Sequence, residues 1–125
     1  MEDISKKAII VEDNLILSIL YENTMKEMVF KTVGEVRDGE SAVKLVRKYG
    51  PDVVIMDIML EGDINGIEAA RQIREFSDVP ILFISGNSDK VHIEAAKLIS
   101  NSDFLSKPIN EEILTRSVKE LLSTD

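Results

Sequence analysis

The chain has 125 residues, of which 44% are hydrophobic and 30% charged, and this composition is typical of one globular domain with its own core. It has no cysteine, which excludes disulfides, thiolate metal sites and a cysteine nucleophile. A net charge of −8 and the lack of any apolar run of membrane-spanning length lead us to expect a cytoplasmic domain that binds neither nucleic acid nor membrane.

The hydrophobic pattern predicts five short strands that alternate with five helices. Apolar runs of strand length occupy 7–11, 30–36, 52–56, 79–84 and 103–106. The third run is apolar on both sides, as expected of a central parallel strand, whereas Gly34 in the second run favours an edge position. Because each strand is followed by a helix, we predict an α/β fold with a parallel sheet covered on both faces.

Apolar residues at three- and four-residue steps give each predicted helix one inward face. In chain order these faces are Leu17, Leu20, Tyr21, Thr24, Met25 and Met28; Ala42, Leu45, Val46 and Tyr49; Ile67, Ala70, Ile73 and Phe76; Val91, Ala95, Leu98 and Ile99; and Leu114, Val118, Leu121 and Leu122. Asp38, Ser88 and Asn110 are the expected N-caps, and Gly50-Pro51 ends the second helix.

Four of the strands end on polar side chains that suit phosphate chemistry. The first is followed by Glu12-Asp13, the third by Asp57, the fourth by Ser85 and the fifth by Lys107. The carboxyl ends of parallel strands lie at one edge of the sheet, where ligands bind in open α/β folds.

Three carboxylates at one site need a positive partner. Two unit charges about 4 Å apart repel by on the order of 4 kcal/mol at an effective dielectric constant of 20. A divalent cation with oxygen ligands, best Mg²⁺, would neutralise Glu12, Asp13 and Asp57, and Lys107 adds a further positive charge. Asp57 stands alone on its strand and is the best candidate nucleophile for a phosphoryl group, while Glu12-Asp13 suit a metal clamp.

These residues in this order resemble the receiver domain of two-component response regulators, over about residues 7–122. The resemblance implies a flavodoxin-like, doubly wound three-layer fold with strand order 2-1-3-4-5, and one receiver domain over 1–125. It implies that a histidine kinase or histidine phosphotransfer protein donates a phosphoryl group to Asp57. Mg²⁺, with Mn²⁺ as a substitute, would be held by Asp13, Asp57, Glu12 largely through water, and the Met59 backbone carbonyl.

The resemblance also implies how the signal would leave the domain. Ser85 would shift toward the phosphoryl group, Lys107 would contact it, and Phe104 would turn inward. The face formed by the fourth helix, fifth strand and fifth helix would then change and bind a downstream protein, and the domain would be a monomer or a phosphorylation-dependent dimer. Lys107-Pro108 corresponds to a cis peptide in the family.

The sequence departs from the common family pattern at three places. Glu61 stands where proline is most common, in a 57–66 loop that is one residue longer than usual. Ser85 replaces the more frequent threonine. Met59 and Asn87 occupy positions that tune phosphoryl lifetime, and we expect moderately slow self-hydrolysis because Met59 cannot hydrogen-bond an attacking water.

Each candidate residue also has a simpler interpretation. Asp57 and Glu12-Asp13 could cap turns or a helix, Lys107 could be a surface lysine, and Ser85 has no weight without the others. His92, the only histidine, is expected to be exposed and incidental. Ile93 is either an isolated exposed residue or part of the partner-binding face, and 61–63 is expected to be a solvated turn whose length could instead affect kinase docking.

Two other functions compete with a signalling switch. A Mg²⁺-dependent phosphatase would form the same aspartyl phosphate, but such enzymes usually carry a second acid at the position of Met59. A flavin or nucleotide site would need glycines or hydroxyls where Glu12-Asp13-Asn14 lie. We therefore expect a signalling protein rather than an enzyme, with no output segment after the fifth helix unless the chain is a piece of a larger regulator or hybrid kinase.

Overall fold

The computed structural model describes residues 5–86 and 90–123, and strands and helices alternate along the described chain. The elements are β1 (Lys6–Val11), α1 (Leu15–Glu27), β2 (Phe30–Val36), α2 (Gly39–Tyr49), β3 (Val53–Asp57), α3 (Gly66–Arg74), β4 (Ile81–Ser85), α4 (Lys90–Lys97), β5 (Ser102–Ser106) and α5 (Glu111–Ser123). The predicted order of elements is confirmed.

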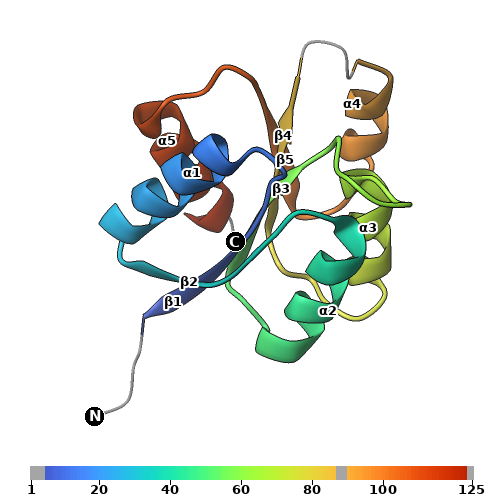
Figure 1. Ribbon diagram of the computed structural model, residues 1–125, viewed down its shortest axis with the longest axis horizontal. Helices are drawn as coiled ribbons and strands as arrows, with labels where there is room; N and C mark the ends of the chain where they lie inside the picture. The colour runs from blue at the N-terminus through green and yellow to red at the C-terminus, as the bar shows by residue number, and fades with distance from the viewer. Residues whose placement is uncertain (1–4, 87–89, 124–125) are drawn as a thin grey trace.

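The five strands form one parallel sheet in the order β2-β1-β3-β4-β5. Helices α1 and α5 cover one face of the sheet, and α2, α3 and α4 cover the other (Figure 1). This is the flavodoxin-like three-layer fold that the resemblance implied. Strand β2, which contains Gly34, lies at an edge as predicted.

Side chains cap the helices where the sequence allows it. Asn14, Asp38, Asn65 and Asn110 each accept a hydrogen bond from the backbone N–H three residues ahead, at 2.7 to 3.0 Å. The caps at Asp38 and Asn110 were predicted, and the predicted cap Ser88 lies outside the described residues. Such caps satisfy backbone donors that the first helical turn leaves unpaired.

Two apolar layers hold the sheet in place. On the α1–α5 side, Ile10 and Ile55 pack with Tyr21, Met25 and Val118. On the other side, Met56 and Phe83 pack with side chains of α2, α3 and α4. Strands β3 and β4 are buried along their whole length, which confirms their central position.

Three predicted core residues are exposed. Tyr49 is the last residue of α2, is exposed and has the Lys48 ammonium over its ring. Val91 and Leu98 have 79% and 83% of their surface exposed, because α4 and the turn after it direct Ala96 and the predicted core residue Ile99 into the core. At 100° per residue, Val91 lies about 140° around the helix from Ala96, so the two cannot share a face.

The orientation of α4 also differs from the prediction at two of its other residues. His92 and Ile93, which were expected on the outer face, are half-buried. His92 lines a hollow between α3 and α4, together with Asp63, Glu68 and Ala95. Within the described residues, no helix is long and apolar enough to cross a bilayer.

Candidate functional site

The strand order brings three acidic side chains together at the carboxyl ends of β1 and β3. These strands are neighbours, with Val11 paired to Met56, so Glu12, Asp13 and Asp57 follow them at one edge. One carboxylate oxygen from each residue lies within 4.8 Å of the others. We call Glu12, Asp13 and Asp57 the acidic cluster. The predicted parallel strands had placed these residues at the same edge of the sheet, and the structure confirms that they converge.

Lys107 reaches the acidic cluster from the loop between β5 and α5. Its Nζ lies 3.2 Å from Asp57 Oδ2 and 3.5 Å from Glu12 Oε1. The two carboxylate side chains are only 4% and 1% exposed, whereas that of Lys107 is 29% exposed. Burial alone would lower the pKa of Lys107, but the charges of Asp57 and Glu12 outweigh it and raise that pKa. The Lys107-Pro108 peptide is cis, as predicted.

Glu12 is the most perturbed acid of the cluster. Burial, with a smaller contribution from Asp57, raises its pKa from 4.5 to about 7, although the Asn14 N–H and Lys107 act in the opposite direction. The Asn14 N–H donates to Glu12 Oε2 at 3.1 Å. Burial favours the neutral form of a carboxyl group, so the metal-free site holds part of its Glu12 protonated near neutral pH.

The acidic cluster fits a hard divalent cation. Among the described residues, buried Glu12 Oε1 accepts no hydrogen bond and has only the ion pair with Lys107 at 3.5 Å. Asp13 is half-exposed and adds an oxygen open to solvent. Three carboxylates in one place, with a single lysine to balance Glu12 and Asp57, suit Mg²⁺, which binds few carboxylates and keeps several waters.

Asp57 is held from two sides. Lys107 contacts Oδ2, and the Met59 N–H donates to Oδ1 at 3.3 Å. Beyond Met59 the chain returns so closely that a Cβ on Gly66 would collide with the Asp57 carbonyl. The Gly66 N–H donates to the Ile58 carbonyl at 2.7 Å, which closes the loop between β3 and α3. Two contacts thus hold the Asp57 carboxylate, and the closed loop packs against the Asp57 backbone.

The two predicted switch residues lie behind this cluster. Ser85 is fully buried, and its hydroxyl donates to the Leu105 carbonyl at 3.4 Å. Phe104 is half-buried against the α3–α4 side of the core, with the Lys97 ammonium 5.9 Å from its ring centre. The shift of Ser85 toward a phosphoryl group, the inward turn of Phe104 and the metal contact of the Met59 carbonyl stay predictions. Asn87 lies outside the described residues.

Arg37 was missed by the sequence analysis. Its Nη2 lies 2.9 Å from Glu61 Oε1 and its Nε lies 3.4 Å from Glu61 Oε2, so the loop expected to be a solvated turn is tied to the end of β2. The signal in the sequence was the unusual acid at Glu61. A pairing between residues 24 positions apart gives no periodic pattern that would reveal it.

A second missed feature is an apolar patch on the first turns of α1. Leu15, Ile16 and Ile19 have 67%, 78% and 47% of their surface exposed. Leu15 and Glu12 line the same small hollow, of about 190 Å³, between α1 and the end of β2. Exposed apolar side chains grouped beside a functional site are typical of a protein-binding surface.

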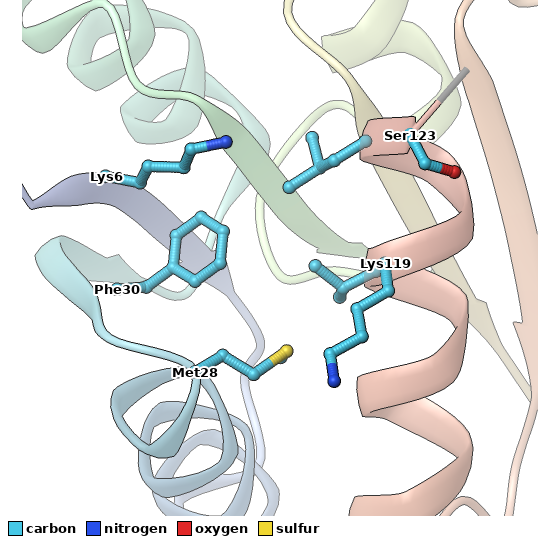
Figure 2. Close-up of a pocket in the computed structure, with 7 residues that line it drawn as sticks. Lys6, Met28, Phe30, Lys119 and Ser123 are labelled. Carbon is cyan, nitrogen blue, oxygen red and sulfur yellow. The ribbon is translucent and has the colours of Figure 1, made fainter.

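An apolar groove lies elsewhere on the molecule (Figure 2). It has a volume of about 430 Å³ and is lined by Met28, Phe30 and Val118, with the ammonium groups of Lys6 and Lys119 beside it. Lys6 begins β1, whereas Glu12 follows the end of that strand. The groove is therefore at the opposite end of the sheet from the acidic cluster and takes no part in it.

Comparisons with known proteins agree with this geometry. The family model of the response regulator receiver domain matches residues 8–119. The aerobic respiration control protein ArcA of Escherichia coli K12 is 34% identical over 119 residues, covering 92% of this chain and 48% of ArcA. The transcriptional regulatory protein DegU of Brevibacillus brevis is 37% identical over 94 residues, covering 74% and 39%. The chain thus spans less than half the length of these relatives.

Solved structures show the same fold. The signal receiver domain of a modulated diguanylate cyclase from Desulfovibrio desulfuricans G20 superposes with a TM-score of 0.84 at 28% identity, covering 94% of each chain. A response regulator receiver protein from Sinorhizobium medicae WSM419 gives 0.85 at 24% identity, covering 97% of each chain, and this similarity concerns the fold alone.

Proposed function

Because the chain belongs to the response regulator receiver family, we propose that Asp57 accepts a phosphoryl group from a histidine kinase or a histidine phosphotransfer protein. A receiver domain is a phosphoacceptor in two-component signalling rather than a turnover enzyme, and a histidine kinase is its expected partner. We further propose that the receiver domain comprises residues 1–125, with its core at about 7–122, and that it does not itself bind nucleic acid.

The observation that carries this proposal is the environment of Asp57. Its carboxylate is 4% exposed, beside Glu12 and Asp13 and in contact with Lys107. In the transfer, an Asp57 oxygen attacks the phosphorus of a phosphohistidine, the P–O bond forms, and the P–N bond breaks to release the imidazole. Such reactions depend mainly on positioning and on neutralisation of charge.

Each neighbour of Asp57 has a distinct part in this proposal. Asp13 and Asp57 hold Mg²⁺ or Mn²⁺ directly, Glu12 holds it largely through water, and the Met59 carbonyl completes the protein ligands. When bound, the cation neutralises the carboxylates and the phosphoryl oxygens. Lys107 exchanges its contact with Asp57 Oδ2 for one with a phosphoryl oxygen, because both are anionic oxygens at the same place.

The response to phosphorylation is proposed to pass through Ser85 to the face formed by α4, β5 and α5. The Ser85 hydroxyl now bonds Leu105 in β5, so its departure toward a phosphoryl oxygen removes a contact between β4 and β5. Phe104 then turns inward. Val91 on α4 and Leu98 directly after it are already exposed, which supports this face as the site of a downstream protein or of a phosphorylation-dependent dimer.

The donor is proposed to dock on α1. Leu15, Ile16 and Ile19 form an exposed apolar patch that begins three residues after Glu12. A helix that carries the phosphohistidine could pack on this patch while its imidazole reaches Asp57. The patch supplies the contact area, and the acidic cluster supplies the chemistry.

The decisive experiment uses a small phosphodonor and Mg²⁺, followed by intact-mass measurement. Wild type should gain one base-labile phosphoryl group, whereas Asp57→Asn should gain none, and a chelator should suppress the reaction. Steady turnover of a generic phosphate ester without a stable adduct would favour a phosphatase instead. A phosphorylated Asp57→Asn variant would remove Asp57 from its proposed role.

The lifetime of the adduct tests Met59 separately. Met59 is 50% exposed, two residues after Asp57, and its side chain cannot hydrogen-bond an attacking water. We expect Met59→Asn to shorten the lifetime of the phosphorylated form in a mass-based decay assay. An unchanged decay rate would show that Met59 does not determine it.

A further inference from the structure

The loop between β3 and α3 is attached to the connection between β2 and α2 at several points. Glu61 pairs with both Nε and Nη2 of Arg37, and it also forms a β-bridge with Asp38. Two residues on, the Asp63 N–H donates to Glu40 Oε1 at 3.2 Å. These contacts lie at the tip of the loop, next to the segment that carries Met59.

The tip has little freedom to rearrange without breaking these contacts. Gly62 has a φ of +93°, which favours glycine, and a Cβ there would lie 2.9 Å from Glu40 Oε2. Glu61 is only two residues from Met59, whose N–H holds Asp57 Oδ1. The position of Glu61 is therefore coupled through two peptide units to a hydrogen bond on the phosphoacceptor.

Arg37 also lines the same small hollow as Glu12 of the acidic cluster. The hydrogen bond and charge of Glu61 raise the pKa of Arg37, and the charge of Asp13 adds to the effect. Arg37 is thus a cation within the electrostatic reach of a proposed metal ligand. On charge alone, it should oppose the binding of a second cation at Asp13.

We propose that Arg37 and Glu61 form a positioning pair that holds Met59 in place beside Asp57 and so favours cation binding, in spite of the charge of Arg37. This inference rests on the proposed function of the acidic cluster. The guanidinium draws the loop toward β2 through two parallel contacts, a geometry that a lysine could not reproduce. Neither residue touches the phosphoryl group.

The competing interpretation is an ordinary surface ion pair. The side chains of Arg37 and Glu61 are 58% and 55% exposed, and exposed pairs contribute little to stability. Global stability is therefore a poor test. Mg²⁺ affinity separates the two interpretations. Arg37→Gln removes a positive charge near the cation site, so an ordinary surface pair predicts equal or tighter Mg²⁺ binding. A positioning pair predicts weaker Mg²⁺ binding.

The experiment measures Mg²⁺ binding to the full chain by titration calorimetry for Arg37→Gln, Glu61→Gln and the double variant. A positioning pair predicts a Kd about two- to fivefold weaker in both single variants, with no further loss in the double variant. Tighter binding by Arg37→Gln, or an unchanged Kd, would overturn the proposal. Arg116→Gln is the matched control, since it breaks an exposed pair with Glu112 on α5 and should leave the Kd unchanged.

A second measurement needs no metal. In chelator, amide hydrogen exchange at Met59 should become faster in both single variants, while Arg116→Gln should exchange like wild type. Unchanged protection at Met59 would reject the pair as a positioning device. Failure of the proposed function has a different signature: wild type itself would neither bind Mg²⁺ nor become phosphorylated.

Discussion

At the acidic cluster, charged side chains are buried and contact one another, whereas on α4 apolar side chains lie in solvent. Glu12 and Asp57 are almost inaccessible and share one lysine, while Val91 and Leu98 are among the most exposed apolar residues of the described chain. A buried charge needs a partner in a fixed place, but an exposed leucine does not. The acidic cluster is therefore held within the domain, whereas the exposed α4 side belongs to the face that we propose for a downstream protein.

Among the predictions, we expect the largest effect on stability from a comparison of the neighbouring residues Leu98 and Ile99. Ile99 is 9% exposed and packs with the α3–α4 core, so Ile99→Ala should lower the free energy of unfolding by about 2–3 kcal/mol. Leu98, 83% exposed, should tolerate Leu98→Ala within about 0.5 kcal/mol. Urea denaturation measures both. Similar losses at the two positions would mean that α4 is turned differently.

The pH dependence of stability tests the burial of Glu12 in the acidic cluster. Burial raises the pKa of Glu12 from 4.5 to about 7, so between these values the folded chain binds more protons than the unfolded one. The free energy of unfolding of the metal-free protein should therefore fall as pH rises through this window, by on the order of 1–3 kcal/mol. Above pH 7 this contribution no longer changes.

Glu12→Gln isolates that effect. The variant cannot titrate at position 12, so its stability between pH 4.5 and 7 should lack the downward contribution seen in wild type. Other acids, such as Asp38, have lowered pKa values and act in the opposite direction at lower pH, but they are common to both proteins. Parallel curves for wild type and Glu12→Gln would contradict the raised pKa.

Asp13 should show opposite effects on stability and metal binding. Lys107 pairs with Glu12 and Asp57, so Asp13→Asn relieves repulsion without removing a partner of Lys107. In chelator, the variant should be more stable than wild type by about 1 kcal/mol, since Asp13 is half-exposed and its charge is partly screened. Its Mg²⁺ affinity should fall by about tenfold or more, because a proposed direct ligand is lost.

The control for Asp13→Asn is Glu120→Gln, an equal change of charge on the exposed side of α5. It should alter neither metal-free stability nor Mg²⁺ affinity. A metal-free Asp13→Asn protein that is less stable than wild type would mean that Asp13 makes favourable contacts that outweigh the repulsion.

The acidic cluster could be predicted because strand patterns are local. The apolar run at 53–56 shows the extent of β3 in the sequence itself, and Asp57 ends this strand at the sheet edge. Periodicity did not fix the strand order, which came from the family resemblance. Once the order is known, Glu12 and Asp57 must be neighbours, because Val11 and Met56 pair directly.

The α4 surface and the Arg37–Glu61 pair could not be predicted in the same way. Helix α4 is short, and Ala95 and Ala96 give only a weak signal of which side faces inward. Larger residues, Val91 and Leu98, suggested the wrong face. Arg37 and Glu61 lie on separate elements, and only the closed loop after Asp57 brings them together. Long-range polar contacts depend on loop conformation, which apolar patterns do not describe.

The smallest expected effect concerns Lys97, the exposed lysine at the end of α4. It pairs with Glu94 at 3.3 Å and lies over the Phe104 ring, but its side chain is 53% exposed and that of Glu94 is 79% exposed. Lys97→Ala should therefore lower the free energy of unfolding by less than about 0.5 kcal/mol in urea denaturation. Lys97→Met, which keeps most of the aliphatic stem, should be closer still to wild type. If both variants lost more than about 1 kcal/mol of unfolding free energy, the Lys97 charge would stabilise the α4 side of the domain. Exposed Lys97 and half-buried Lys107 would then differ only in the size of their contribution.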